Sequence, residues 1–329
     1  MDEARRSRLV SLFRSHSPPL LPGPLPELPP FLEERLYPGG KGLRGEGSFP
    51  AAPLRAVLFD IYGTLFHSAA GDIENSQVWG KGEGEKTAAL DALAREYTGK
   101  PCGEELRQYF RSAVLNIHRE RSSQTPFPEV RVEEIWADFL KSRAGSGESP
   151  AALSGKSLDE AAEELALRFE LAVNPVYPMP GAEETIRGLK KAGYILGLIS
   201  NAQFFTPLLF EAFFDRPPEA LGFEPALLLY SFETGEAKPS PRLFSLALER
   251  LAAWGIGAEN CLYVGNDMRN DIYGAASAGF QTVLFAGDGR SLRIREAGPE
   301  NRPPSALIRR LEDLLFLPAA GQFAGKKEM

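Results

Sequence analysis

The chain has 329 residues, of which 43% are hydrophobic and 25% are charged, and its formal net charge is −7. This is the composition of a globular protein, which excludes disorder along the whole chain, and the length allows roughly two domains or one domain with an insertion. The acidic balance argues against binding to nucleic acid or to an anionic membrane, because phosphate contacts need clustered lysine and arginine side chains.

The first segment, residues 1–53, is dense in proline after a short basic amphipathic piece at residues 5–13. Proline at this density disfavours regular helix and strand. We therefore expect an N-terminal extension that lies on the rest of the protein or is loosely ordered, with a docking arm of the PxxP type as the alternative. No chemistry is assigned to this segment.

The next segment, residues 56–59 (AVLF), is apolar at every position. A strand that is apolar on both faces belongs inside a parallel sheet covered by helices. The same pattern recurs at residues 194–200, 226–230, 261–264 and 281–285, and helical patterns separate these segments at residues 182–192, 241–253 and 271–278. This alternation predicts an α/β fold with a doubly wound parallel sheet and right-handed crossovers.

A block of different character, residues 67–177, follows the first strand. Apolar residues at helical spacing predict four helices there, near residues 85–97, 104–122, 132–144 and 158–173. A helical insertion at this place predicts a cap over the carboxyl ends of the strands. The predicted α/β core then comprises residues 54–66 and 178–317, and residues 318–329 form a tail.

Polar residues follow several of the predicted strands directly. Asp60 follows the first, Ser200 and Asn201 the second, Lys238 comes shortly after the third, and three residues follow the fourth: Asn266, Asp267 and Asp271. In open α/β sheets ligands bind outside the carboxyl ends of the strands. Any one of these residues alone could be a helix cap or a solvated side chain, but four matching strand ends together indicate an active site.

The motifs that carry these residues are FDIYGTL (59–65), LISNA (198–202), EAKPSPRLF (236–244) and VGNDMRNDIYGA (264–275). They resemble the four ordered motifs of the haloacid dehalogenase superfamily, over roughly residues 54–290. The resemblance implies a hydrolase that works through an aspartyl-enzyme intermediate, with the helical block in the position of the superfamily's cap.

The residue types suit that chemistry. Asp60 can attack phosphorus or carbon, and Ser200, the backbone around Asn201 and Lys238 can supply donors and positive charge to a phosphoryl group. Tyr62 and Thr64, in the same turn as Asp60, are also counted among the catalytic candidates. Oxygen ligands for one Mg²⁺ are predicted from Asp60, Asp267 and Asp271, and the resemblance implies that the carbonyl of Tyr62 completes the set.

Two positions depart from the phosphatase pattern. Most phosphatases of this superfamily have Asp two residues after the nucleophile as general acid and base, and this chain has Tyr62, as in haloacid dehalogenases. A halide leaves without a proton, whereas an alkoxide needs an acid, and such acid–base help contributes ~10² to 10⁴-fold. The second departure is Asn266, where phosphatases usually show Asp; either Asn266 supplies a neutral oxygen or Asp267 takes the role.

The cap contributes weaker candidates, namely His118 and Arg119 for recognition of an anionic substrate. The alternative is that they form a solvated helix face, with Trp136 nearby as a core residue. The glycine-rich stretches at residues 39–42 and 80–84 follow no strand and match no complete nucleotide-binding motif, so a kinase or an NAD enzyme is not expected.

Three hypotheses remain. The first is a Mg²⁺-dependent phosphohydrolase of a small phosphorylated metabolite, the second a metal-independent 2-haloacid dehalogenase-like hydrolase, and the third a non-catalytic relative that binds a phosphate ligand or a protein. Two distant cysteines and three histidines make no zinc motif or disulfide framework, and no apolar stretch reaches the ~20 residues that cross a bilayer. A cytoplasmic protein without membrane or nucleic-acid partners is therefore expected, of unknown oligomeric state.

Overall fold

The structure is a computed structural model that describes residues 1–17, 22–25, 27–29, 32, 34, 53–68, 83–144, 154–294, 303–318 and 320. The chain divides into two compact units. Unit 1 comprises Met1–Pro19, Ser68–Tyr177 and Gln203–Asp215, and unit 2 comprises Leu20–His67, Pro178–Ala202 and Arg216–Met329. No helix within the described ranges is long and apolar enough to cross a membrane.

Unit 2 is built on a six-stranded sheet in the order β5-β4-β1-β6-β7-β8, and every strand pair in it is parallel. The strands are β1 (Ala56–Phe59), β4 (Ile195–Ser200), β5 (Phe223–Tyr230), β6 (Cys261–Gly265), β7 (Gln281–Phe285) and β8 (Ala306–Ile308). The central strands are buried at almost every position, which matches their apolar sequences. Strands β2 (Phe66–Ser68) and β3 (Val176–Pro178) form a separate two-stranded sheet.

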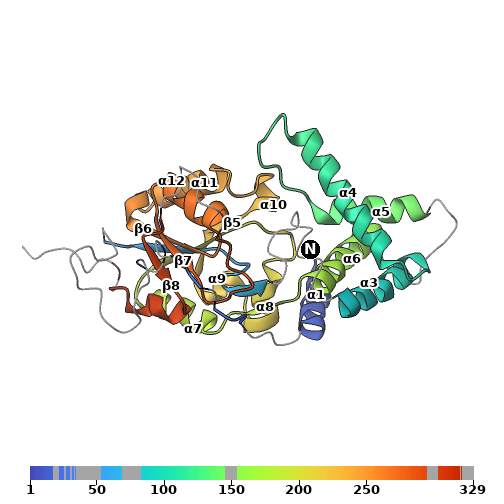
Figure 1. Ribbon diagram of the computed structural model, residues 1–329, viewed down its shortest axis with the longest axis horizontal. Helices are drawn as coiled ribbons and strands as arrows, with labels where there is room; N and C mark the ends of the chain where they lie inside the picture. The colour runs from blue at the N-terminus through green and yellow to red at the C-terminus, as the bar shows by residue number, and fades with distance from the viewer. Residues whose placement is uncertain are drawn as a thin grey trace, which may run out of the picture. The chain divides into compact units, whose positions relative to one another are not determined.

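Helices cover both faces of the large sheet (Figure 1). On one face, α11 (Arg242–Ala252) and α12 (Gly274–Ser277) pack over the strands, and Leu243, Phe244 and Leu251 of α11 share a core cluster with Leu58 and Tyr263. On the other face lies α7 (Ala182–Lys191). The remaining helical segments of unit 2 are short: α9 (Pro218–Leu221), α10 (Ser231–Thr234), η3 (Ala258–Asn260), η4 (Met268–Tyr273) and η5 (Leu311–Phe316).

This architecture confirms the predicted α/β class with a parallel sheet. The five predicted strands are all present, and β5 begins three residues earlier than expected, at Phe223. Strand β8 was not predicted, because three apolar residues give too short a pattern to distinguish a strand. The predicted helix at residues 271–278 is divided between η4 and α12.

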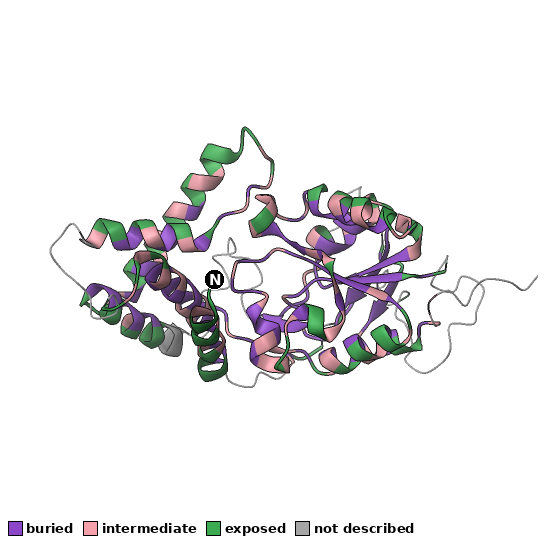
Figure 2. Cartoon of the chain, turned by 180° about the vertical axis from the view of Figure 1, so that it is seen from behind, coloured by how far each residue is buried: buried purple, intermediate pink, exposed green. Residues whose placement is uncertain are grey.

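Unit 1 contains the four predicted helices of the inserted block, within two residues of the expected ends: α3 (Glu83–Thr98), α4 (Gly103–Arg121), α5 (Val132–Ala144) and α6 (Leu158–Val173). The buried sides of α4, α5 and α6 meet in an aromatic cluster, in which Trp136 stacks on Phe110 at 5.6 Å and contacts Phe169 at 4.8 Å between ring centroids. Figure 2 shows these helices with buried and exposed residues along their length, as expected of amphipathic helices.

The N-terminal segment begins with a helix, α1 (Glu3–His16). The expectation that proline prevents regular helix in residues 1–53 is therefore wrong for residues 3–16, because the prolines begin only at Pro18. Its buried residues, Leu9 and Phe13, pack where α1 meets α6 and α8 (Leu208–Phe214), and Phe13 contacts Phe205 edge to face. Unit 1 therefore includes residues outside the predicted cap range 67–177, whose boundaries stay a prediction. Most of the predicted tail, residues 318–329, lies outside the described residues.

Candidate active site

The site lies at the carboxyl end of the central strand. β1 runs between β4 and β6, and Phe59 is level with Leu198 of β4 and Val264 of β6. Asp60 follows immediately, and its backbone N–H donates to the Val264 carbonyl at 2.9 Å. Because the three parallel strands end at one edge of the sheet, the polar residues that follow them lie close together.

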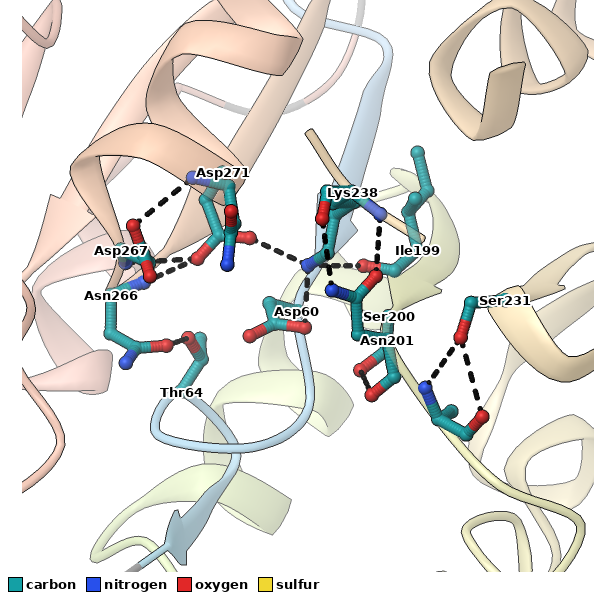
Figure 3. Close-up of polar contacts among 12 residues, drawn as sticks. Asp60, Thr64, Ile199, Ser200, Asn201, Ser231, Lys238, Asn266, Asp267 and Asp271 are labelled. Carbon is teal, nitrogen blue, oxygen red and sulfur yellow. Dashed lines mark hydrogen bonds and ion pairs between the residues drawn. The ribbon is translucent and has the colours of Figure 1, made fainter. Parts of the chain in front are cut away.

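Lys238 is the hub of this group (Figure 3). Its Nζ donates to Asp60 Oδ1 at 2.8 Å and to Asp271 Oδ1 at 2.6 Å. It also contacts the Ile199 carbonyl at 3.1 Å and the Tyr263 hydroxyl at 2.9 Å. The ammonium group therefore holds one oxygen of Asp60, while the other oxygen of that carboxylate points away from Lys238 in Figure 3.

The electrostatics of this cluster keep Lys238 charged. The lysine side chain is 2% exposed, and burial acts to lower its pKa, but the carboxylates of Asp271 and Asp60 outweigh burial and raise the pKa above its ordinary value. Burial and the charge of Asp60 raise the pKa of Asp271, while Lys238 acts in the opposite direction. A buried cation that bridges two carboxylates is therefore fixed at the foot of the site.

Asp271 holds the loop that follows β6 as well as the lysine. Its Oδ2 accepts the backbone N–H groups of Asn266 at 3.0 Å and Asp267 at 2.9 Å, and its Oδ1 accepts Lys238 Nζ and the Tyr263 hydroxyl. Both oxygens are thus engaged by donors. The contacts of Asp271 favour a role in orienting Lys238 and this loop, and its predicted role as a metal ligand stays a prediction.

Asp267 and Asn266 are also held by hydrogen bonds. Asp267 is the N-cap of η4, and its Oδ1 accepts the backbone N–H groups of Arg269 at 2.8 Å and Asn270 at 3.0 Å. Asn266 Oδ1 accepts the Thr64 hydroxyl at 3.2 Å, and its Nδ2 donates to the Ser291 carbonyl at 2.6 Å. Asn266 therefore ties the turn after β1 to the loop after β7.

Asn201 fixes the backbone of Lys238 through two hydrogen bonds. Its Oδ1 accepts the Lys238 N–H at 2.6 Å, and its Nδ2 donates to the Lys238 carbonyl at 3.1 Å. Ser200, at the end of β4, is fully buried, and its hydroxyl donates to the Asn201 carbonyl at 3.2 Å. The predicted residues Ser200, Asn201 and Lys238 thus lie together with Asp60.

The turn after β1 is closely packed. Gly63 has a φ of +86°, and a Cβ there would lie 2.3 Å from Asn266 Nδ2, so only glycine fits. Thr64 is buried beside it, and Tyr62 is half-buried and bridges to Phe66. The FDIYGTL motif therefore builds a turn that holds Asp60 at its start.

The predicted substrate-binding residues, His118 and Arg119, lie on α4 in unit 1, where His118 is half-buried and Arg119 is exposed. Trp136 is completely buried in the aromatic cluster of unit 1, in agreement with its interpretation as a core residue. The role of His118 and Arg119 in recognition stays a prediction.

The side chains fit Mg²⁺ if the ion has one or two carboxylate ligands. In the part of the chain that the structure describes, no three His, Cys, Asp or Glu side chains gather in a group that could hold a metal. Mg²⁺ commonly takes only one or two carboxylates, with water and substrate phosphate completing its shell. Asp60 and Asp267 offer carboxylates, and the Tyr62 carbonyl and Asn266 amide offer neutral oxygens. Three carboxylates against one ammonium also leave negative charge for a cation to offset.

Sequence patterns missed several residues of the site. Tyr263 lies within a predicted strand, and its hydroxyl lies 2.8 Å from the Ile199 carbonyl and 3.1 Å from Asp271 Oδ1, so that its single proton can be donated to either acceptor. A buried tyrosine usually finds a partner for its hydroxyl, which is a signal that could have revealed it. Ser231 accepts the Ala202 N–H at 2.8 Å and so ties the loop after β4 to α10, but no pattern marks it.

Comparison with known proteins identifies a family. The haloacid dehalogenase-like hydrolase family matches residues 54–279. A (S)-2-haloacid dehalogenase 4A from Burkholderia cepacia is 31% identical over 232 residues, which cover 70% of this chain and 82% of that protein. A solved 2-haloacid dehalogenase from Pseudomonas syringae is 24% identical, with a TM-score of 0.49, over 79% of this chain and 96% of that one.

Phosphatases are also among the relatives. A glyceraldehyde 3-phosphate phosphatase from Pyrococcus furiosus is 32% identical over 113 residues, which cover 32% of this chain and 41% of that protein. The chain thus spans about two fifths of the length of this relative. The sequence similarity places a hydrolase core here and includes proteins named for both reactions.

Proposed function

Because the chain belongs to the haloacid dehalogenase-like hydrolase family, we propose that it is a Mg²⁺-dependent phosphohydrolase of a small phosphorylated metabolite, with Asp60 as the nucleophile. The observation that carries the proposal is the placement of Asp60 at the end of β1, with one oxygen held by Lys238. The other oxygen is the one that would attack. A carboxylate fixed in this way has little orientational freedom to lose on the way to the transition state.

In the proposed reaction, Asp60 attacks phosphorus as the bond to the leaving oxygen breaks, which forms an aspartyl phosphate on Asp60. Water then attacks the phosphorus, and the Asp60 carboxylate and inorganic phosphate are released. Lys238 and Ser200 would donate to the phosphoryl oxygens, and Asp271 and Tyr263 would keep Lys238 in place. Mg²⁺, held by Asp60, the Tyr62 carbonyl and an oxygen of Asn266 or Asp267, would neutralise charge on the phosphoryl group.

Substrate recognition is proposed from His118 and Arg119, which could bind an anionic group of the metabolite. The phosphatase relatives support a small phosphorylated substrate. The proposed location is the cytoplasm, and the two free cysteines, Cys102 and Cys261, are consistent with a reducing compartment. If Arg119→Ala left the KM for such a substrate unchanged, its role in recognition would be disproved.

A second candidate function is metal-independent hydrolysis of 2-haloacids. Two observations favour it. Tyr62 occupies the position of the usual acid, and a relative that is 31% identical over 70% of this chain is named a haloacid dehalogenase. In that reaction Asp60 would displace halide from carbon to form an ester, and water would then hydrolyse the ester. The departing halide needs no proton, so this reaction would not require an acid at the position of Tyr62.

The test is phosphate release from p-nitrophenyl phosphate, with Mg²⁺ or with EDTA, by the wild type, Asp60→Asn and the control Asp159→Asn. Asp159 is an exposed residue of α6, so its variant should behave as the wild type. We expect Mg²⁺-dependent release that Asp60→Asn abolishes. Release that persists in Asp60→Asn would refute the nucleophile.

Halide release from 2-chloropropionate that EDTA leaves unchanged would establish the dehalogenase instead. The absence of turnover in both assays would indicate a non-catalytic relative that binds a phosphate ligand or a protein.

A further inference from the structure

A second buried polar cluster lies beside the site, around Asp288 in the loop after β7. The carboxylate is 2% exposed and accepts four donors. Oδ1 accepts the N–H groups of Gly23 at 2.6 Å and Arg290 at 3.0 Å, and Oδ2 accepts the Ser291 hydroxyl at 2.7 Å and contacts His67 Nδ1 at 2.9 Å. A carboxylate with this many donors is a fixed point in unit 2.

His67 is the member of the cluster that belongs to the strand after the nucleophile turn. It is 2% exposed in β2, and among the described residues its Nε2 has no hydrogen-bond partner. Within the described part of the chain, the polar contact that anchors the imidazole is therefore that of Nδ1 with Asp288. The Ser291 hydroxyl donates to Asp288 and not to His67, so the three side chains are not arranged as a nucleophilic Ser-His-Asp triad.

The cluster is connected to the nucleophile turn by a continuous path. Ser291 links its hydroxyl to Asp288 and its carbonyl to Asn266 Nδ2 at 2.6 Å. Asn266 Oδ1 then accepts the Thr64 hydroxyl at 3.2 Å. The segment from residue 60 to residue 67 thus has two anchors: His67 contacts Asp288 in the loop after β7 directly, and Thr64 is connected to that loop through Asn266 of the loop after β6.

The segment has little other freedom. Asp60 is fixed at its start by the Val264 carbonyl and Lys238, and Gly63 packs so closely on Asn266 that no Cβ fits. If the anchor at His67 were lost, the strain of repacking would fall on this short segment. A displacement of about 1 Å at a reacting group can cost about 10²-fold in rate.

We propose that His67 and Asp288 are positioning residues, which hold the end of the turn that carries Asp60 so that its carboxylate meets the substrate in the reactive orientation. This inference rests on the proposed function of Asp60 as nucleophile. Neither residue touches the proposed reacting atoms. Their effect acts through the backbone of residues 60–67 and through the path by Ser291 and Asn266.

The test compares His67→Ala with His67→Asn. The Asn side chain can place an N–H donor near the position of Nδ1, whereas Ala removes the donor. We expect His67→Ala to lower kcat for p-nitrophenyl phosphate by about 10-fold to 100-fold with little change in KM, and His67→Asn to recover most of the loss. His16→Ala, at the exposed end of α1, is the matched control and should keep the wild-type kcat.

Amide hydrogen exchange supplies a readout that does not depend on turnover. We expect His67→Ala to speed exchange in peptides that cover residues 60–66, and His67→Asn to restore protection, while peptides that cover residues 195–200 stay unchanged. Circular dichroism would verify that both variants are folded.

The proposal is overturned if folded His67→Ala keeps the wild-type kcat, or if folded His67→Asn loses as much as His67→Ala. If the wild type shows no turnover in either assay, the proposed function fails, and exchange alone decides the positioning role. Faster exchange in His67→Ala, restored by Asn, would then support the role of His67 in holding the turn, and unchanged exchange would refute it.

Discussion

Replacement of Lys238 by Met gives the sharpest test of the site's electrostatics. Met retains most of the side-chain volume but removes the ammonium group that contacts Asp60 at 2.8 Å and Asp271 at 2.6 Å. Two buried carboxyl groups would then lie close together without a cation, and because burial and the charge of Asp60 already raise the pKa of Asp271, this pair would stay buried only with a repulsion that proton uptake at Asp271 relieves in part. Removal of one partner from a buried ion pair costs about 3–5 kcal/mol, because the remaining charge is left uncompensated. We expect the free energy of unfolding to fall by this amount at neutral pH.

The assay is equilibrium urea unfolding followed by circular dichroism. Arg187→Met is the control, since the Arg187–Glu183 pair is exposed, with Arg187 69% exposed, and should cost no more than about 0.5 kcal/mol. The double variant Lys238→Met with Asp271→Asn removes one of the two repelling charges and should be less destabilised than Lys238→Met alone. A loss of less than about 1 kcal/mol for Lys238→Met, as for a surface pair, would refute this account of the site.

Three further predictions concern single residues. Burial acts to raise the pKa of Asp288, but the contacts of His67 and Ser291 and two backbone N–H groups outweigh burial and lower it. The free energy of unfolding lost in Asp288→Asn should therefore be large at pH 7 and should shrink as the pH falls below the unfolded pKa of about 4. Urea unfolding at several pH values checks this. Burial raises the pKa of the Cys261 thiol to about 12. Ellman's reagent at pH 8 should therefore label only half-buried Cys102 in the folded protein and both thiols in urea. Fast labelling that survives Cys102→Ser would contradict this. Tyr62→Asp should raise phosphate release from an alkyl phosphate relative to p-nitrophenyl phosphate by about 10² to 10⁴-fold, and an unchanged ratio would show that the absent acid is not what limits the wild type.

The sequence predicts the fold well because the determining signals are local. Apolar runs such as residues 56–59 specify buried parallel strands, and helical spacing specifies α3 to α6. The helix α1 was missed because the prolines that dominate residues 1–53 set the prediction for the whole segment, although they begin only after α1 ends. Strand β8 escapes prediction because three residues cannot display a period.

The candidate site is only partly written in the sequence. Motif positions at strand ends identify Asp60, Lys238 and Asp271 as neighbours, because parallel strands end at one edge of the sheet. They do not say which oxygen meets which donor. Both carboxylate oxygens of Asp271 accept hydrogen bonds, from Lys238, Tyr263 and two backbone N–H groups. This arrangement follows from the packing of the loop after β6.

The contacts with the longest sequence separation are decided by tertiary structure alone. Local patterns predict the parallel α/β core and the four helices between β1 and β4, and they place the candidate acidic and basic residues at the strand ends. The pairing of His67 with Asp288, 221 positions apart, has no local signature and exists because β2 and the loop after β7 are brought together by the folded sheet. The period of the apolar residues predicts which face of a helix or strand is buried. The partner of a buried polar group depends instead on which distant segments the tertiary structure brings together.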